Sequence, residues 1–500
     1  MSLPYVAVSM LLGVVLVAGP VDPASAATTK KKLARSRVVA QDANGVYQFP
    51  KRTVRWKSPT QATFRGCFEV LECAIVEAPM NYADPFSPAL ELSVVRHRAT
   101  DPARRIGSLF VNPGGPGASA NGLIRGAERI FPPEVVARFD IVGLDPRGTT
   151  NSAPVSCGID PLDLDTIRTE SQYLKAIAAA CGKRSGQLLK YIDTESSVRD
   201  HDWVRQALGE DKVNYLGFSY GGYLGAMYAQ LFPTTLRSVV LDSGLDHTLF
   251  GTALLEGGYA ANERSLLAFL RQCQDGAYAP CAFNNGTDLV ARYDQLLSYY
   301  GGSRSRESRR SRFEGTVERL LESQSNGGWK ILADGLAVAA SKPDVDPYNG
   351  FDLRSFVPRP DYEVLESIFA YQCHDGLVTQ NQAELAGLGA RLPAAAPHFS
   401  VNARGTADLY QICGYWPQKT KPQPTITPNG IAPVLLVGAT LDLITPIEWQ
   451  QSMVATTGGT LLTRVGSDHG QIGRGTCVDP YAVDFLVNLV LPQPNIVCTG

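Results

Sequence analysis

The chain has 500 residues, of which 44% are hydrophobic and 19% are charged, and its formal net charge is −2. This composition supplies enough apolar side chains for a substantial core and excludes a globally disordered protein. A net charge so close to zero argues against a basic nucleic-acid-binding protein, so we expect no nucleic-acid partner.

The first 26 residues have the pattern of a secretory signal peptide. An apolar run extends from Tyr5 to Gly19, and Ala24–Ala26 has the small-residue form that signal peptidase accepts. We therefore predict a signal peptide over residues 1–26 and a secreted, extracytoplasmic mature chain. No Lys or Arg precedes the apolar run, whereas a signal peptide usually begins with a positively charged segment. A membrane anchor and a misplaced start codon are therefore the alternatives. Because the run is too short for a comfortable transmembrane helix, we expect no stable membrane insertion after cleavage.

Short apolar runs flanked by Gly, Pro or Asp alternate with helical patterns over residues 91–244. Near-continuous Val/Ile/Leu strands separated by helices are typical of a parallel sheet that is covered on both faces. The same short apolar runs return late in the chain, and they are followed by an amphipathic helical segment, Tyr481–Val490. The predicted strands are Leu92–His97, Ser108–Asn112, Phe139–Leu144, Val213–Leu216, Leu236–Leu241, Pro433–Gly438 and Thr460–Val465.

A Gly/Pro-rich loop, residues 112–117, directly follows the second predicted strand. Glycine leaves the backbone N–H groups of such a loop accessible, because no Cβ stands between them and a ligand. We predict that Gly115 or Gly114 donates one hydrogen bond to an oxyanion, and that Tyr220 donates the second.

The most specific motif of the chain is Gly217-Phe-Ser-Tyr-Gly221, which fits G-x-S-x-G. The residues before it read as a strand, and Gly222–Leu231 reads as a helix that ends before Pro233. This context is that of a nucleophile elbow, in which the serine lies on a strained strand-to-helix turn. Ser219 is therefore the predicted nucleophile. It requires a histidine base and a carboxylate elsewhere in the chain.

Helical periodicity mixed with polar loops replaces the strand pattern over residues 245–431. Glu263–Arg271 and Tyr362–Ala370 are two of the predicted helices in this region. Because strand-like segments resume after it, we interpret it as a helical cap inserted into the sheet domain rather than as a separate domain. The basic, serine-rich run Arg304–Arg312 shows no hydrophobic period, and we interpret it as a solvated loop.

The two remaining catalytic candidates follow the two late strands. Asp442 lies just past the carboxyl end of the strand near residue 438, where open α/β sheets collect functional groups. His469 follows the strand that ends near Val465, and it is the one histidine of the six that fits the chain order Ser, Asp, His. The alternatives are that Asp442 caps the next helix, that His469 lies free on the surface, and that Asp468 is the acid.

The predicted architecture is an α/β-hydrolase core, a mostly parallel sheet with helices on both faces, that carries a large inserted helical cap. The first part of the core spans residues 27–244, the cap spans residues 245–431, and the last part of the core spans residues 432–500.

Ten cysteines, an even number, are compatible with export. Their spacing indicates five sequential pairs, although spacing alone does not determine connectivity. The pairs are Cys67–Cys73, Cys157–Cys181, Cys273–Cys281, Cys373–Cys413 and Cys477–Cys498. No compact Cys/His cluster is present, so we expect no metal site.

These motifs together resemble the secreted tripeptidyl and prolyl aminopeptidases of the α/β-hydrolase fold. The resemblance extends from about Cys67 to Cys498 and departs from the family pattern at Gly222, Ser243 and Asp468. The segments that carry it are Asn112–Gly117, Asp145–Gly148, Arg199–Asp200, Trp203–Arg205, Leu208–Gly209, Gly217–Gly221, Asp442, Thr445–Pro446 and His469.

The resemblance implies a serine exopeptidase that needs no cofactor and releases tripeptides or single residues from peptide substrates with a free amino terminus. Members of this family use acidic cap residues to hold the substrate's α-ammonium. The candidates here are Asp246, Glu256, Glu263 and Asp375. The alternatives are a secreted carboxylesterase or lipase on the same fold and, from another class, a non-catalytic binding or scaffold protein.

Overall fold

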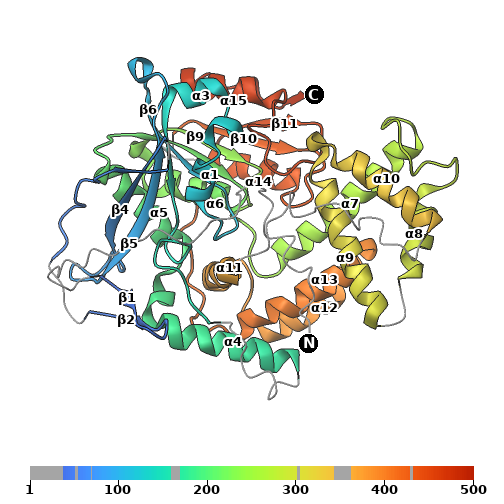
Figure 1. Ribbon diagram of the computed structural model, residues 1–500, viewed down its shortest axis with the longest axis horizontal. Coiled ribbons are helices and arrows are strands. Elements are labelled where there is room, and N and C mark those ends of the chain that lie inside the picture. The colour runs from blue at the N-terminus through green and yellow to red at the C-terminus, as the bar shows by residue number, and fades with distance from the viewer. Residues whose placement is uncertain are drawn as a thin grey trace.

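A ten-stranded sheet organises the molecule (Figure 1). The computed structural model describes residues 38–50, 55–68, 70–158, 169–300, 304–342, 362–427 and 432–499, so the predicted signal peptide lies outside the described residues. The strand order across the sheet is β12-β11-β10-β9-β8-β6-β7-β5-β4-β3. The strands are β3 (Arg65–Phe68), β4 (Leu71–Pro79), β5 (Ala89–His97), β6 (Gly107–Asn112), β7 (Phe139–Leu144), β8 (Val213–Phe218), β9 (Leu236–Asp242), β10 (Val434–Ala439), β11 (Thr460–Arg464) and β12 (Ile496–Cys498).

Seven strands, from β7 and β6 through β12, pair in parallel, whereas β3, β4 and β5 pair antiparallel. This confirms the predicted mostly parallel sheet. The antiparallel edge was not predicted, because β3 and β4 are not among the strands expected from the sequence. A separate two-stranded ribbon is formed by β1 (Ala40–Gln41) and β2 (Tyr47–Gln48).

Every residue of β6, β7, β8 and β10 is buried, because helices cover both faces of the sheet. Alternate residues of a strand point to opposite faces. Accordingly, Val434 and Leu436 of β10 belong to one hydrophobic cluster, while Leu435 and Val437 belong to the other.

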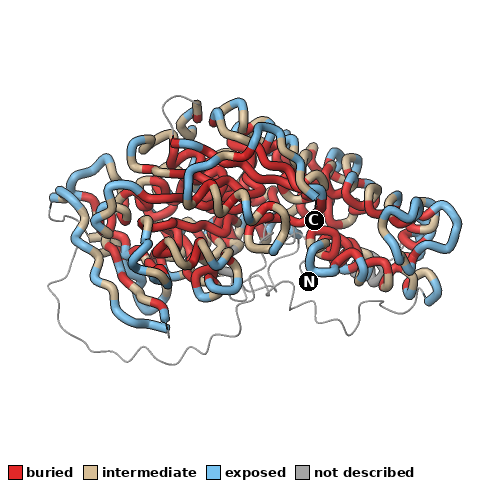
Figure 2. Tube along the Cα trace, turned by 90° about the horizontal axis from the view of Figure 1, so that it is seen from above, coloured by how far each residue is buried: buried red, intermediate tan, exposed pale blue. Residues whose placement is uncertain are grey.

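One face of the sheet is covered by helices that contribute to the smaller cluster: α1 (Ala120–Ile124), α2 (Ala127–Ile130), α3 (Pro133–Arg138) and α15 (Val478–Asn488). The larger cluster lies on the other face and continues into the helices between β9 and β10. Figure 2 shows the buried residues, in red, as a band that runs along the length of the molecule. The helices that contribute to the larger cluster outside this inserted region are α4 (Glu170–Ser185), α5 (Thr194–Ala207), α6 (Tyr220–Leu231) and α14 (Ile447–Thr457).

Between β9 and β10 the described residues contain helices and no strand. We call this helical region the cap, and its helices α8 and α10 lie at the side of the molecule remote from β4 and β5 (Figure 1). Its α-helices are α7 (Ala253–Gln274), α8 (Leu289–Tyr299), α9 (Arg304–Leu321), α10 (Gly328–Ser341), α11 (Tyr362–Asp375), α12 (Gln382–Ala395) and α13 (Ser400–Leu409).

The interpretation of Arg304–Arg312 as a solvated loop is wrong, because these residues form the first half of α9. The arginines hid the helical pattern, and the one buried side chain described in this stretch, that of Ser311, is itself polar, with 6% exposed. The five predicted disulfides are all present, and the described chain has no free cysteine. No described helix combines the length and the apolar character that a membrane span needs.

Candidate active site

Ser219 lies on the sharp turn between β8 and α6. Its backbone has φ 58° and ψ −125°, a conformation that costs energy for a residue with a Cβ. Glycines surround it because the chain is crowded here: a Cβ on Gly217 would lie 2.1 Å from the carbonyl oxygen of Gly221. The turn presents the Ser219 hydroxyl at the carboxyl end of the sheet, as the elbow motif predicts.

The glycine-rich loop after β6 passes directly over this turn. A Cβ on Gly114 would lie 2.8 Å from the Cβ of Ser219 and 3.0 Å from the backbone nitrogen of Tyr220, so only glycine fits. The N–H of Gly114 donates to Oδ1 of Asn112 over 2.9 Å, which leaves Gly115 as the oxyanion donor of the two predicted alternatives. Tyr220 begins α6, where a backbone N–H has no acceptor within the helix.

Asp442 and His469 are in direct contact. Nδ1 of His469 lies 3.0 Å from Oδ2 and 3.2 Å from Oδ1 of Asp442, and both residues are 1% exposed. The backbone N–H groups of Ile444 and Thr445 each donate to Oδ1 of Asp442 over 2.9 Å, and the Thr445 hydroxyl donates to Oδ2 over 3.0 Å. Asp442 therefore does not cap α14, which has Pro446 at its N-cap.

Backbone hydrogen bonds bring the Ser219 turn and the His469 loop to the same segment, residues 242–245 after β9. The N–H of Ser219 donates to the carbonyl oxygen of Asp242 over 3.0 Å, and the N–H of Leu245 donates to that of Ser219 over 2.9 Å. From the other side, the N–H of Gly470 donates to Oγ of Ser243 over 3.0 Å. The segment thus connects the Ser219 turn and the His469 loop at one edge of the sheet, and His469 in turn contacts Asp442.

The electrostatics of His469 suit a general base. Burial alone would lower the pKa of its imidazole, but the carboxylates of Asp442, Glu322 and Asp242, with Asp442 contributing most, together raise that pKa. Nε2 of His469 makes no hydrogen bond to any described residue. With Nδ1 held by Asp442, Nε2 is the ring nitrogen that can take a proton from a nucleophile.

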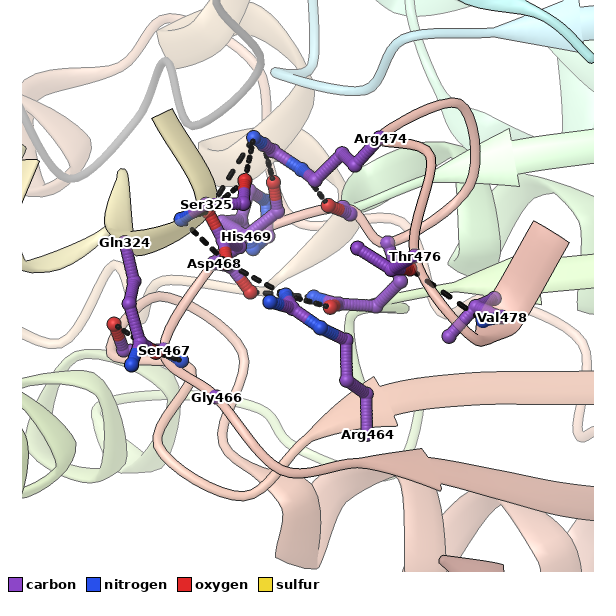
Figure 3. A network of polar contacts seen from close by, with 12 residues as sticks. Gln324, Ser325, Arg464, Gly466, Ser467, Asp468, His469, Arg474, Thr476 and Val478 are labelled. Atoms are coloured by element: carbon purple, nitrogen blue, oxygen red, sulfur yellow. Dashed lines mark hydrogen bonds and ion pairs between the residues drawn. The ribbon is translucent and has the colours of Figure 1, made fainter. Parts of the chain in front are cut away.

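The rival acid, Asp468, does not bind the imidazole. Its carboxylate accepts hydrogen bonds from the backbone and hydroxyl of Ser325 and forms an ion pair with Arg464 (Figure 3). Adjacent residues of a loop point in different directions, and of these two carboxylates only that of Asp442 reaches the ring.

The four predicted amine-binding acids have other contacts. Oδ1 of Asp246 accepts from the N–H of Thr248 over 2.8 Å, Glu256 forms an ion pair with Arg391 over 2.9 Å, and Glu263 binds His398. Asp375 is fully buried and accepts from the N–H and hydroxyl of Thr194; burial raises the pKa of its carboxyl well above the ordinary value.

Three glutamates that the sequence reasoning missed, Glu314, Glu318 and Glu322, lie four residues apart along α9 and its C-terminal end and are buried. Burial raises the pKa of Glu322 to about 7, and its carboxyl interacts electrostatically with His469 and Asp442. The four-residue spacing is the signal that would have found them, because it places all three on one face of a helix. No group of described His, Cys, Asp and Glu side chains has the arrangement of a metal site.

Comparison with known proteins agrees with this geometry. Residues 107–470 match the family model of the alpha/beta hydrolase fold. The chain is 27% identical over 473 residues to the protein named Serine protease Hip1 of Mycobacterium tuberculosis, covering 85% of this chain and 87% of that one.

Two further relatives have different names. The chain is 30% identical over 462 residues to Tripeptidyl aminopeptidase of Streptomyces coelicolor, covering 86% of this chain and 83% of the relative. It is also 30% identical over 458 residues to Carboxylesterase B of Mycobacterium tuberculosis, covering 85% and 86%. The resemblance to tripeptidyl aminopeptidases drawn from the motifs is confirmed.

Proposed function

The chain belongs to the α/β-hydrolase fold family and is a hydrolase, and from that premise we propose that it is a serine exopeptidase acting on free amino termini. Ser219 is the nucleophile, His469 the general base and Asp442 the acid that orients it. The geometry that supports these roles is the Asp442–His469 contact beside the strained turn of Ser219.

The reaction proceeds through an acyl-enzyme. Nε2 of His469 takes the proton of the Ser219 hydroxyl while Oγ attacks the substrate carbonyl, and the N–H groups of Gly115 and Tyr220 stabilise the oxyanion. The imidazolium then gives this proton to the leaving amine as the peptide bond breaks. Water, deprotonated by His469, attacks the ester and releases the new carboxyl terminus, which restores the Ser219 hydroxyl.

The observation that carries the exopeptidase assignment is the carboxyl of Glu322 beside this machinery. The residue is 7% exposed, and its carboxyl makes no hydrogen bond to any described residue. The carboxyl lies in the field of His469, Arg319 and Arg474, but no described residue donates a hydrogen bond to it, and a substrate's α-ammonium is a donor and a cation of the right kind. We propose that Glu322 binds this group, in place of Glu256 and Glu263, whose carboxylates already form ion pairs.

Export of the mature chain is part of the proposal. Five disulfides support an oxidising compartment, and the signal-peptide pattern over residues 1–26 supports secretion. The test is the amino-terminal sequence of protein recovered from outside the producing cell, which should begin at Ala27.

The decisive assay compares matched peptide amides with free and acetylated amino termini, together with short acyl esters. We expect rapid turnover of the free peptides, little turnover of the acetylated ones and no turnover by Ser219→Ala. Equal rates on free and acetylated peptides would remove the aminopeptidase assignment. Fast ester hydrolysis without peptide cleavage would favour the second candidate, a carboxylesterase, which the relative named Carboxylesterase B supports.

A further inference from the structure

Asp468 is a fully buried carboxylate that ties together three parts of the chain. From the cap, the N–H of Ser325 donates to Oδ1 over 3.0 Å and its hydroxyl donates to the same oxygen over 2.8 Å. From the end of β11, Arg464 forms an ion pair with Oδ2. From beyond His469, Nη1 of Arg474 lies 3.4 Å from Oδ1.

The same arginines hold the backbone of the histidine loop. Nη2 of Arg474 donates to the carbonyl oxygen of His469 over 2.7 Å, and its Nε donates to that of Gly470. Nη1 of Arg464 donates to Oε1 of Gln471 over 3.1 Å, and the Gln471 amide donates to the carbonyl oxygen of Asp468. Figure 3 shows these groups converging on the backbone on both sides of His469.

The cap contributes a second set of bonds to the residue before Asp468. Oε1 of Gln324 accepts from the N–H of Ser467 over 3.0 Å, and Nε1 of Trp329 donates to the Ser467 hydroxyl over 2.9 Å. That hydroxyl in turn donates to the carbonyl oxygen of Leu321. Gln324 and Ser325 belong to the short 3-10 helix η5 (Gln324–Asn326), which directly follows the end of α9.

We propose that Asp468 is a positioning residue for His469, through which the η5 corner of the cap fixes the orientation of the imidazole toward Ser219. Asp442 orients the ring from its Nδ1 side. Ser243 and Asp242 bind the backbone N–H groups just after His469, and Asp468, its two arginines and the cap add a second hold on the backbone that carries the ring. The proposal rests on the proposed function in taking His469 as the base that activates Ser219.

The sequence provides an independent reason to assign this role to Asp468. Asp468 is one of the positions at which the chain departs from the pattern of the family that it resembles. Its carboxylate is what connects the cap and the histidine loop through side-chain contacts.

The primary test is the double variant Gln324→Ala/Ser325→Ala, which removes the side-chain bonds of the cap to Ser467, Asp468 and Arg474 and changes no charge. The readout is the second-order rate at which a small fluorophosphonate labels Ser219, measured as a function of pH. We expect the high-pH plateau to fall about tenfold with the midpoint unchanged, because a shift near 1 Å of a reacting group costs on the order of 10²-fold. Restoring the hydroxyl as Gln324→Ala/Ser325→Thr should recover part of the rate.

Ser323→Ala is the matched control, since Ser323 lies between α9 and η5, and its hydroxyl donates over 2.9 Å to the carbonyl oxygen of Arg319 in α9 and to no described residue of the histidine loop. It should label at the wild-type rate. Asp468→Asn should lower the plateau further. If this variant fails to fold because Arg464 loses its ion-pair partner, the double variant, which changes no charge, still tests the proposal.

An unchanged plateau in the folded double variant, or an equal loss in Ser323→Ala, would overturn the proposal. A change confined to the KM of peptide substrates would also overturn it, because the cap would then act on binding alone. The probe has no peptide bond and no amine, so its reaction reports the alignment of Ser219 and His469 even if the exopeptidase assignment fails.

Discussion

The carboxyl edge of the sheet and the acidic face of α9 hold their functional groups by different means. At the edge, backbone bonds fix each group: Ser219 is bound to residues after β9, and Asp442 accepts two backbone N–H groups. On α9, Glu314 also accepts two backbone N–H groups, but no described residue donates a hydrogen bond to the Glu322 carboxyl, and burial raises the pKa of both carboxyls to about 7.

Under the proposed function, this difference separates the groups that carry out the chemistry from the group that recognises the substrate. Groups fixed by the backbone act on any acyl substrate, because their geometry does not depend on what else is bound. A buried carboxyl of raised pKa gains most when a cation arrives, so it acts only on substrates that carry one. Substitutions at the edge should therefore lower turnover generally, while substitutions on α9 should weaken the binding of free amino termini.

The strongest test of the edge is Asp442→Asn. We expect kcat to fall about 10⁴-fold on peptides and esters alike, because the imidazole loses both its orientation and the charge that stabilises the imidazolium. Steady-state kinetics on both substrate classes measure this.

Asp140→Asn is the matched control for Asp442→Asn. Asp140 is another buried aspartate; it accepts from the N–H of Ala99 over 2.9 Å and pairs with Arg105, but it lies at the amino end of β7, away from the site. It should leave kcat near the wild-type value. If Asp468→Asn proves more damaging than Asp442→Asn, the assignment of the acid must be exchanged.

The comparison extends to stability through the disulfides. Cys373–Cys413 closes a separation of 40 residues within the cap, whereas Cys67–Cys73 closes 6 residues at the antiparallel edge. Chain-entropy arguments predict a loss of about 4 kcal/mol in the free energy of unfolding for the first pair and about 2 kcal/mol for the second. Urea unfolding of the two double Cys→Ala variants measures the difference, and equal losses would show that loop length is not the controlling quantity.

On α9 the sharpest test is Glu322→Gln, which keeps the shape and removes the charge. Since hydrogen bonds to charged groups contribute about 1.5–3 kcal/mol, we expect kcat/KM on free peptides to fall about 10-fold to 100-fold, mainly through KM. Acyl esters and fluorophosphonate should react at nearly the wild-type rate.

Glu256→Gln is the matched control for Glu322→Gln, because it breaks the Glu256–Arg391 ion pair on the partly exposed side of α7. In the opposite pattern, Glu256→Gln would raise KM and Glu322→Gln would leave it unchanged. That result would assign the amine site to Glu256, one of the residues predicted from the sequence.

The features that could be predicted from the sequence lie mainly at the carboxyl edge of the sheet, and those that could not lie mainly in the cap. The elbow and the order of Ser219, Asp442 and His469 could be predicted because each follows a buried strand, and strand ends are local features of sequence. Gly114 and Gly217 are likewise fixed by crowding: a Cβ would lie 2.6 Å from the carbonyl oxygen of Phe218 at Gly114 and 2.1 Å from that of Gly221 at Gly217, and this leaves a glycine signature.

The rest depends on contacts that no local pattern encodes. The N-terminal half of α9 was missed because its arginines mask the helical pattern and its one described buried side chain, that of Ser311, is polar, and Glu322 was missed with it. The strand β4 pairs antiparallel with β5 over nine residues, and its charged residues Glu72 and Glu77 interrupt the apolar run by which a strand is recognised. The role of Asp468 depends on Ser325, which lies 143 residues away in sequence.

The smallest expected effect concerns pH and the stability of the acidic face. The folded pKa of Glu314, about 7, lies above its ordinary value of 4.5, so the folded protein holds this proton more tightly than the unfolded chain. Its contribution to stability is fully present below pH 4.5 and is lost as the pH rises through 7. Between pH 6 and pH 8 the loss should be about 1 kcal/mol for this carboxyl.

Glu314→Gln cannot titrate, so its free energy of unfolding should fall less steeply over this interval than that of the wild type. Urea unfolding at pH 6, 7 and 8 measures the slope. Glu448→Gln, whose side chain is 58% exposed, is the control that should retain the wild-type slope, because water solvates that carboxylate in both states. A wild-type slope in Glu314→Gln would mean that this carboxyl is already ionised in the folded protein, held by Arg310 and by the backbone N–H groups of Val401 and Asn402. Glu322 and Glu318 would then be the remaining carboxyls on the acidic face of α9 whose pKa burial raises, and the difference between the two regions would rest on them.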